Sequence, residues 1–284
     1  MTACPATGPG RTLVALAAVV SIACGAPLMK LPSGPGGPAP DAADLLAQAT
    51  TACRSVRTFT AEIAVSGSVG GRRTRGRLAA GLAAPASARL EAFAPFGPPL
   101  FIFAATGDEA TVLLSGDARV LEQGRPDAVL EAIAGVPLGA AELRATLTAC
   151  TTGAADAAGA RRLGDPWRAV PVGAGHEVYL HREGAPAKWR LVATVRHAAG
   201  PERGWRAEYG DFENDLPRTV RVTSESDGPS RFDLRLALSQ VETNRPLDAD
   251  VFRIQIPQAA TAITLEDLRQ WGPLAEKPPN AHAR

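Results

Sequence analysis

The stretch RFDLRLALSQV, residues 231–241, decides the fold class of this chain. Its apolar residues occupy every second position from Phe232 to Leu238, and the positions around and between them are mostly charged or polar. A period of two is typical of a β-strand with one buried and one solvated face. The stretch therefore predicts an amphipathic strand at the wall of a core.

The same alternation recurs along most of the chain. Residues 59–66 repeat it, and short glycine turns at 70–71, 107–108 and 116–117 separate strands as antiparallel hairpins do. No helical crossover lies between these strands, so a parallel sheet is disfavoured. Further strands are expected at residues 73–77, 88–92, 100–104, 111–114, 177–181, 189–195, 203–209, 218–224 and 253–257.

Helical spacing of apolar residues replaces this alternation in a few segments. Asp41 is placed to cap the first of them, and Thr264, with Asp267 three residues on, is placed to cap the last. The two middle segments are placed to lie over the open face of the sheet. The expected helices cover residues 41–56, 127–134, 139–147 and 264–271.

The N-terminus has the pattern of an export signal. Arg11 supplies positive charge, residues 13–23 are an apolar run too short for a permanent membrane span, and small residues precede Cys24. Residues 21–24, SIAC, resemble a lipobox, although the pattern prefers leucine where Ser21 stands. The resemblance implies cleavage after residue 23 and lipidation of Cys24. An ordinary cleaved signal with an unmodified Cys24 is the alternative.

The mature chain is expected to form one domain on a tether. Residues 25–40 are rich in proline and glycine and bury little apolar surface, so residues 24–40 are expected to be a tether after the lipidated Cys24. Residues 41–271 are long enough to enclose one sizeable core. Residues 272–284 are expected to be a disordered tail. Gly25 replaces the aspartate that retains lipoproteins in the inner membrane, so the lipobox resemblance implies outer-membrane anchoring.

Two of the four cysteines remain available for a disulfide. Cys4 leaves with the signal and Cys24 is acylated, which leaves Cys53 and Cys150 as an even pair in an oxidising compartment. We predict a bond between them. Two buried free thiols are the alternative, because the sequence does not show that they approach each other.

Charge and motifs exclude several classes of function. The formal net charge is +1, with 30 basic and 29 acidic residues, so no overall field recruits nucleic acid. The sequence has no glycine-rich phosphate loop, no serine nucleophile elbow and no zinc-type cysteine pair. These absences lower the expectation of an enzyme, and no catalytic residue, cofactor or metal ligand is predicted.

Three groups of polar residues are considered as sites and explained more simply. His176 and His181 are an odd number of residues apart on a strand, so they face opposite ways and do not form a metal site. The acidic run of residues 211–215 lacks the regularly spaced oxygen ligands of a calcium-binding loop. It is typical of a solvated hairpin turn. The arginines at 72, 73, 75 and 77 suit either a solvated strand face or contact with anionic headgroups.

An aromatic residue stands in the connection APFGPP, residues 94–99. Phe96 lies between two predicted strands and is bounded by proline and glycine. Two interpretations are equally open from the residues alone. The ring packs into the core, or it is an exposed apolar element that inserts into a membrane surface or a protein groove.

At this connection the chain begins to resemble the LolB outer-membrane lipoprotein receptors and the related LolA carriers. The similarity covers roughly residues 45–256. Each matching motif is short, so the resemblance rests on the order in which the motifs follow one another. The matching motifs are PFG at 95–97, VLEAIAGVPL at 129–138, ELR at 142–144, GWRAEYG at 204–210 and PLDADVF at 246–252.

The resemblance implies a mainly β fold, an unclosed antiparallel β-barrel covered by a lid of short helices. In such a fold an apolar cavity holds acyl chains of lipoproteins or other lipids. The lid falls at residues 127–147, and Pro95, Phe96 and Gly97 match the family's protruding insertion loop. The resemblance also implies a lipid-anchored monomer facing the periplasm, with the inner leaflet of the outer membrane and a periplasmic carrier protein as partners.

The apolar residues expected to line this cavity and its lid lie on the predicted strands and helices. They are Ile63, Val65, Leu90, Phe101, Phe103, Leu113, Leu130, Ile133, Val136, Leu138, Leu143, Leu147, Leu234 and Leu236.

Two departures from the family leave the cargo open. Ala145 stands where the family often has tryptophan after its Leu-Arg pair, and the chain has an extra C-terminal segment. The favoured function is binding of acyl chains during localisation of lipoproteins or lipids to the outer membrane. A second hypothesis is an envelope sensor or structural lipoprotein that uses the same fold to bind a protein partner, and a third is a hydrolase.

Overall fold

The computed structural model describes residues 28–93, 98–173, 175–200, 203–225 and 231–271. The chain divides into two compact units, Met1–Lys30 and Leu31–Arg284. Among the described residues, every buried core residue, from Ala39 to Leu268, lies in the second unit. We therefore expect that unit to fold without the first thirty residues.

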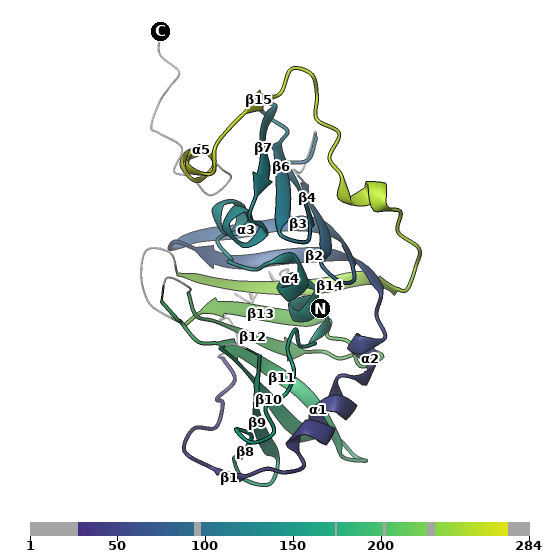
Figure 1. The fold of residues 1–284 in the computed structure, drawn as a ribbon, viewed down its shortest axis with the longest axis vertical. Coiled ribbons are helices and arrows are strands. Elements are labelled where there is room, and N and C mark those ends of the chain that lie inside the picture. Colours follow the sequence, from purple (N-terminus) through teal and green to yellow (C-terminus); the bar gives the residue numbers. More distant parts are fainter. Residues whose placement is uncertain (1–27, 94–97, 174, 201–202, 226–230, 272–284) are drawn as a thin grey trace, which may run out of the picture. The chain divides into compact units, whose positions relative to one another are not determined.

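The described strands of the second unit form a single sheet (Figure 1), in the order β1-β8-β9-β10-β11-β12-β13-β14-β2-β3-β4-β5-β6-β7-β15. Their bounds are β1 Gly37–Pro38, β2 Thr58–Val69, β3 Arg72–Ala83, β4 Ser87–Phe93, β5 Phe101–Thr106, β6 Glu109–Leu114, β7 Arg119–Gly124, β8 Arg161–Arg162, β9 Trp167–Val172, β10 His176–Glu183, β11 Lys188–Arg196, β12 Trp205–Gly210, β13 Thr219–Ser224, β14 Phe232–Thr243 and β15 Thr261–Ala262.

The sheet is antiparallel, as the hairpin pattern predicted, and unclosed, as the family resemblance implied. Most consecutive strands pair with each other, and β14 returns to pair with β2, with Leu238 opposite Ile63. The exception is β15, which pairs in parallel with β7. Because β1 and β15 are the two ends of the strand order and do not pair with each other, the sheet does not close into a barrel.

Short helices accompany the sheet. They are α1 Ala42–Ala49, α2 Thr51–Arg54, α3 Pro126–Ala134, α4 Ala140–Thr148 and α5 Leu265–Trp271, with a 3₁₀ turn η1 at Ala249–Phe252. The segment predicted as one helix over 41–56 is interrupted at Thr50, whose hydroxyl donates to the carbonyl of Leu46 at 2.7 Å. No described helix is long and apolar enough to cross a membrane.

Asp41 does not cap α1 as predicted. Its carboxylate makes no capping hydrogen bond and instead accepts hydrogen bonds from Nε and Nη2 of Arg168 at 3.1 and 2.9 Å. The hydrogen bond and the charge of Arg168 hold the pKa of Asp41 below its usual value, against a smaller opposing effect of burial. Arg168 lies on β9, a strand missing from the sequence prediction, so its role as a partner was not foreseeable. This pair joins the start of α1 to the sheet.

The folded unit extends further than the expected domain at its N-terminal side. Gly37 and Pro38, assigned to the tether, form β1 and pair with Arg162 and Arg161 of β8. Ala39 is buried. The remaining part of the expected tether before residue 28, and the expected tail at 272–284, lie outside the described residues.

The C-terminal segment passes around the sheet. From β14 it contacts β4 and β5 through η1, where the guanidinium of Arg89 donates to the carbonyls of Val251 and Arg253 at 2.9 and 3.0 Å. It then adds β15 to the edge strand β7, and α5 packs against α3 with Leu268 fully buried.

The predicted strand at 253–257 is wrong, because no strand forms there and the edge pairing is made by β15. Pro257 has no backbone N–H, so it cannot donate a hydrogen bond to a neighbouring strand. The predicted cap of the last helix is confirmed, since Thr264 Oγ1 accepts from the N–H of Asp267 at 3.1 Å and Asp267 Oδ2 accepts from the N–H of Thr264 at 2.9 Å.

A disulfide joins Cys53 of α2 to Cys150, which follows α4. Their Cα atoms are 5.7 Å apart. The bond therefore fixes the C-terminal end of α4 to the N-terminal helices.

Candidate functional site

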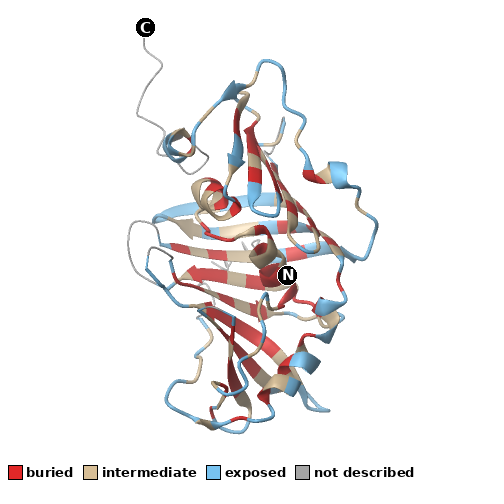
Figure 2. Ribbon diagram, viewed as in Figure 1, coloured by how far each residue is buried: buried red, intermediate tan, exposed pale blue. Residues whose placement is uncertain are grey.

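The inner face of the sheet is a set of apolar rows that cross several strands. One row runs through Leu238, Ile63, Leu78, Ala92 and Phe101, each directly opposite the next. Because side chains alternate along a strand, residues paired in this way share one face. This face, which we call the inner face, contains most of the buried core (Figure 2).

A large hollow of about 1320 Å³ opens on the inner face. A second row borders it, in which Leu236 lies opposite Val65 and Val65 lies opposite Gly76. Val65 and Leu236 are half-buried, and a Cβ atom built on Gly76 meets nothing within 4 Å. The missing side chain of Gly76 and the incomplete burial of its neighbours leave an apolar surface that the described residues do not fill.

Two helices cover part of this face. In α3 the apolar residues Val129, Leu130 and Ile133 are buried, and in α4 Leu143 and Leu147 are buried. The contacts of α4 with β4 and of α3 with β6 place both helices over the inner face (Figure 1). We call α3 and α4 the lid, because they supply apolar residues to the hollow from the side opposite the strands.

Most of the residues predicted for the cavity do line this hollow. They are Ile63, Val65, Leu90, Phe101, Leu130, Ile133, Val136, Leu138, Leu143, Leu147, Leu234 and Leu236. Leu78, Ala92 and Val222 also line it and were not predicted. The small, glycine-rich and arginine-rich composition of β3 hid the alternation that would have identified Leu78.

Two predicted cavity residues lie elsewhere. Phe103 is on the inner face but is fully buried in the core and does not line the hollow. Leu113 is on the opposite face, because its inner-face neighbours on β6 are Val112 and Leu114, which pair with Phe103 and Phe101. The consecutive apolar residues Val112, Leu113 and Leu114 do not show from sequence which of them face a cavity, and this is the reason for the error with Leu113.

The hollow is not confined to the inner face. Its lining also contains outer-face residues of β2, β3 and β14, including Glu62, Arg75, Arg77 and Arg235. The apolar inner-face part is therefore a share of the whole volume, and the rest borders polar outer-face residues of β2, β3 and β14.

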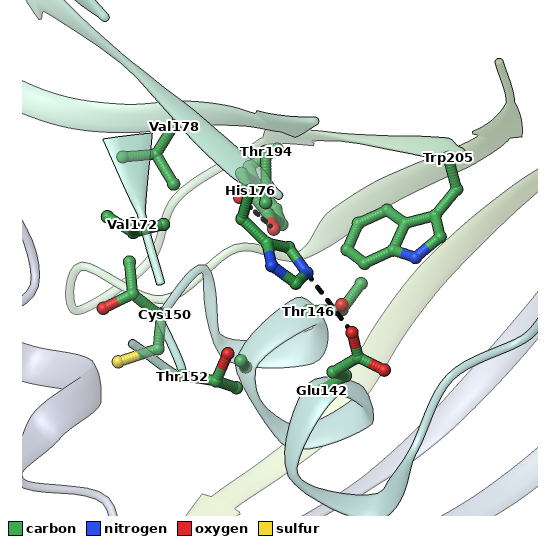
Figure 3. A pocket seen from close by; sticks show the side chains of 12 residues that line it. Glu142, Thr146, Cys150, Thr152, Val172, His176, Val178, Thr194 and Trp205 are labelled. Carbon is green, nitrogen blue, oxygen red and sulfur yellow. Dashed lines mark hydrogen bonds and ion pairs between the residues drawn. The ribbon is translucent and has the colours of Figure 1, made fainter. Parts of the chain in front are cut away.

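A polar cluster holds the start of α4 against the sheet (Figure 3). Glu142 Oε1 contacts Nε2 of His176 at 3.2 Å and accepts from Nη1 of Arg196 at 3.3 Å. Its other oxygen accepts from the N–H of Gly139 at 3.0 Å. Glu142 therefore links the lid to β10 and β11.

The pKa of Glu142 is lowered from its ordinary value. Burial acts to raise it, but the hydrogen bonds from His176 and Gly139, together with the charge of Arg196, outweigh burial. Nearby, burial strongly raises the pKa of the Tyr209 hydroxyl, which donates to Thr194 at 3.1 Å. A small pocket of about 20 Å³ lies among these groups and Trp205 (Figure 3), so it has room for about one water molecule.

Removing the charge of Glu142 should loosen the lid. We expect Glu142→Gln to lower the free energy of unfolding by about 2 kcal/mol at neutral pH, since hydrogen bonds to a charged group contribute about that much. Because the folded-state pKa is depressed, this stabilisation is present above the ordinary value of 4.5 and is lost as the pH falls through the folded-state pKa. Urea unfolding of both proteins across this pH range measures the difference.

The matched control for this prediction is Glu183→Gln. Glu183 also pairs with a histidine on β10, His181, but is more exposed than Glu142. The Glu183→Gln substitution should change the free energy of unfolding little. Equal losses in the two variants, or a Glu142→Gln difference that persists in strong acid, would contradict the role assigned to Glu142.

The histidine pair and the acidic run considered from the sequence do not form sites. His181 contacts Glu183 and stacks on Trp167, away from His176. Asp211, Glu213 and Asp215 engage Thr219, Arg218 and Lys188 respectively. Within the described ranges, no three histidine, cysteine or acidic residues are placed to hold a metal ion.

The predicted insertion residues Pro95, Phe96 and Gly97, and the predicted lipidation site Cys24, lie outside the described residues. The residues on either side of the insertion segment are exposed and apolar. Phe93 is 43% exposed and Leu100 is 53% exposed.

An unclosed antiparallel sheet whose apolar inner face is partly covered by short helices is the LolA-like fold, and this chain has that fold.

The similarity to one solved structure, a LolA superfamily protein, supports this assignment of the fold. A LolA superfamily protein from Nitrosomonas europaea superimposes with a TM-score of 0.52 at 11% identity, over 74% of this chain and 96% of that chain. An outer membrane lipoprotein-sorting protein domain from Vibrio parahaemolyticus gives 0.47 at 11% identity, over 75% and 97%. A DUF1329 family protein from Desulfovibrio piger gives 0.47 at 9% identity, over 74% and 95%. No protein-family model and no curated protein matches the sequence.

Proposed function

We propose that the protein is an exported lipoprotein that binds acyl chains in the hollow of its inner face and takes part in localising lipoproteins or other lipids to the outer membrane. Residues 1–23 are the export signal, Cys24 carries the lipid anchor, and the domain faces the periplasm as a monomer. The observation that carries the proposal is the apolar hollow beneath the lid.

The size and chemistry of the hollow suit this ligand. Typical small-molecule pockets have volumes of about 300–1,000 Å³, and the inner-face part of this hollow is a share of about 1320 Å³ in total. Its inner-face lining is aliphatic and aromatic, from Ile63 and Val65 on β2 to Leu143 and Leu147 on α4. Burial of each acyl methylene contributes about 0.8 kcal/mol, so a carrier needs a surface of this kind to compete with a bilayer.

The mechanism requires no covalent step. An acyl chain moves between apolar sites according to their relative affinities, and the lid moves to admit and release it. Pro95, Phe96 and Gly97 are the element that enters the acceptor membrane. A periplasmic carrier protein is a suitable donor. The protein performs no chemistry on its cargo, needs no cofactor and does not bind nucleic acid.

Native mass spectrometry of Leu31–Arg284, exported to a bacterial periplasm and then extracted for lipids, tests this function. We expect co-purified lipid or acylated peptide. We also expect Phe96→Glu to retain this cargo but to deliver it to liposomes at least ten-fold more slowly, because a charged tip does not enter the acyl region. Ile256→Glu, a charge placed at an exposed apolar position of the C-terminal segment, is the matched control.

The result separates the two hypotheses. An empty domain that takes up no fatty-acyl probe would exclude acyl binding and favour recognition of a protein partner by the same fold. Equal delivery by the Phe96→Glu variant and wild type would instead remove only the role given to the insertion segment.

A further inference from the structure

The outer face of the sheet carries an arginine surface at the end where β2 turns into β3. Arg73, Arg75 and Arg77 alternate along β3, and Arg235 of β14 lies in the same cross-strand row as Arg75, with Ser66 of β2 between them. The three arginines of β3 are exposed and Arg235 is partly exposed. We call these four residues the basic surface.

The acids nearby do not neutralise the basic surface. Asp233 is held by two hydrogen bonds from Arg221, at 2.9 and 2.7 Å. Glu91 is paired with Arg89 at 2.7 Å. Across the part of the chain that the structure describes, none of the four arginines makes an ion pair or a hydrogen bond to a carboxylate. Their charges are therefore available to a partner.

Exposed apolar side chains adjoin these charges. Phe93 of β4 lies directly opposite Arg77 on the same face, and the N–H of Leu100 donates to the carbonyl of Ala92 at 2.7 Å, which brings Leu100 alongside Phe93. Both are among the few large apolar residues that the described protein exposes. This end of the sheet thus combines unpaired guanidinium groups with an apolar patch.

We propose that the basic surface, together with Phe93 and Leu100, docks the protein onto an anionic lipid bilayer. Guanidinium groups form paired hydrogen bonds with phosphate oxygens, and an anionic leaflet attracts clustered arginines close to its surface. Phe93 and Leu100 enter the boundary between headgroups and acyl chains. A purely charged partner would satisfy the arginines but would leave the adjoining apolar pair in water.

Docking in this way orients the molecule. Arg73, Arg75, Arg77, Phe93 and Leu100 all belong to the lining of the hollow, so a membrane bound here contacts the outer-face part of that lining. The inference concerns the recognition of a membrane surface and holds whether or not the inner face carries an acyl ligand.

Vesicle co-sedimentation of Leu31–Arg284, which lacks Cys24, tests the proposal. The vesicles contain phosphatidylcholine alone or with about 30% phosphatidylglycerol, a proportion that gives a strongly anionic surface. We expect binding that needs the anionic lipid and declines at about 1 M salt, where the Debye length is about 3 Å. The combined variant Arg73→Gln, Arg75→Gln and Arg77→Gln should bind about 100-fold more weakly, at about five-fold for each lost charge.

The charge-matched control is the combined variant Arg54→Gln, Arg245→Gln and Arg253→Gln, which removes three exposed arginines outside the basic surface. It should bind like the wild type. Phe93→Ser with Leu100→Ser should weaken binding further without removing its salt dependence. Equal losses in the two arginine variants would show that only net charge matters and overturn the proposal, as would an absence of binding to anionic vesicles by correctly folded protein.

Discussion

Replacing Cys53 and Cys150 together with serine is expected to lower the free energy of unfolding by about 4 kcal/mol. The two cysteines are 97 residues apart in the sequence. A cross-link over a loop of that length removes conformational entropy from the unfolded chain, by an amount that the chain-entropy model places at about 4.7 kcal/mol for a loop of 100 residues. Measured losses on removing native disulfides from small secreted domains are about 2–5 kcal/mol.

Urea unfolding of oxidised wild type, reduced wild type and the double serine variant measures this contribution. The reduced wild type and the variant should unfold at similar urea concentrations, well below the oxidised protein. Each single serine variant should resemble the double variant, because either substitution removes the same bond. An oxidised protein that unfolds like the reduced protein would mean that the bond does not form in the exported chain.

The antiparallel sheet could be predicted because its decisive strands are solvated on one face. In β14, Phe232, Leu234 and Leu238 are buried while Arg235 and Ala237 between them are not. The turn glycines then fixed the direction of neighbouring strands. The same reasoning failed for β9, where Arg168, Ala169 and Val170 are all buried. Contact with α1 covers the strand and removes the alternation.

The site was predicted less completely than the fold. Apolar residues of β2 and of the lid helices were identified because each has one polar face. Leu113 was misassigned because it lies within the apolar run from Val112 to Leu114, although the other outer-face residues of β6 are Glu109 and Thr111. The link between Glu142 and His176 joins residues 34 positions apart. No local pattern marks such a pair, since it depends on how α4 lies against β10.

Filling the hollow from within should abolish most of its affinity for acyl chains. Gly76 lies on the inner face beside Val65, and a Cβ atom built there meets nothing within 4 Å. We therefore expect Gly76→Phe to place its aromatic ring in the space beside Val65. If the ring excludes about two methylenes of a bound chain, the loss is about 1.6 kcal/mol, or roughly 15-fold in the dissociation constant.

Gly81→Phe is the matched control, because Gly81 lies on the same strand, its added Cβ also meets nothing within 4 Å, and its register places it on the outer face. Both variants should fold, which circular dichroism and urea unfolding can verify.

Titration with fluorescent fatty-acyl probes of increasing length gives the sharpest readout. In the wild type each added methylene that is buried should strengthen binding by up to about 0.8 kcal/mol, until the chain exceeds the hollow. In Gly76→Phe, binding should stop strengthening at a shorter acyl-chain length than in the wild type. In Gly81→Phe this limiting chain length should be unchanged. An affinity that does not depend on chain length in the wild type would mean that the probes bind outside the hollow. A limit shifted equally by both variants would mean that the phenylalanine acts through the strand and not by occupying the space beside Val65.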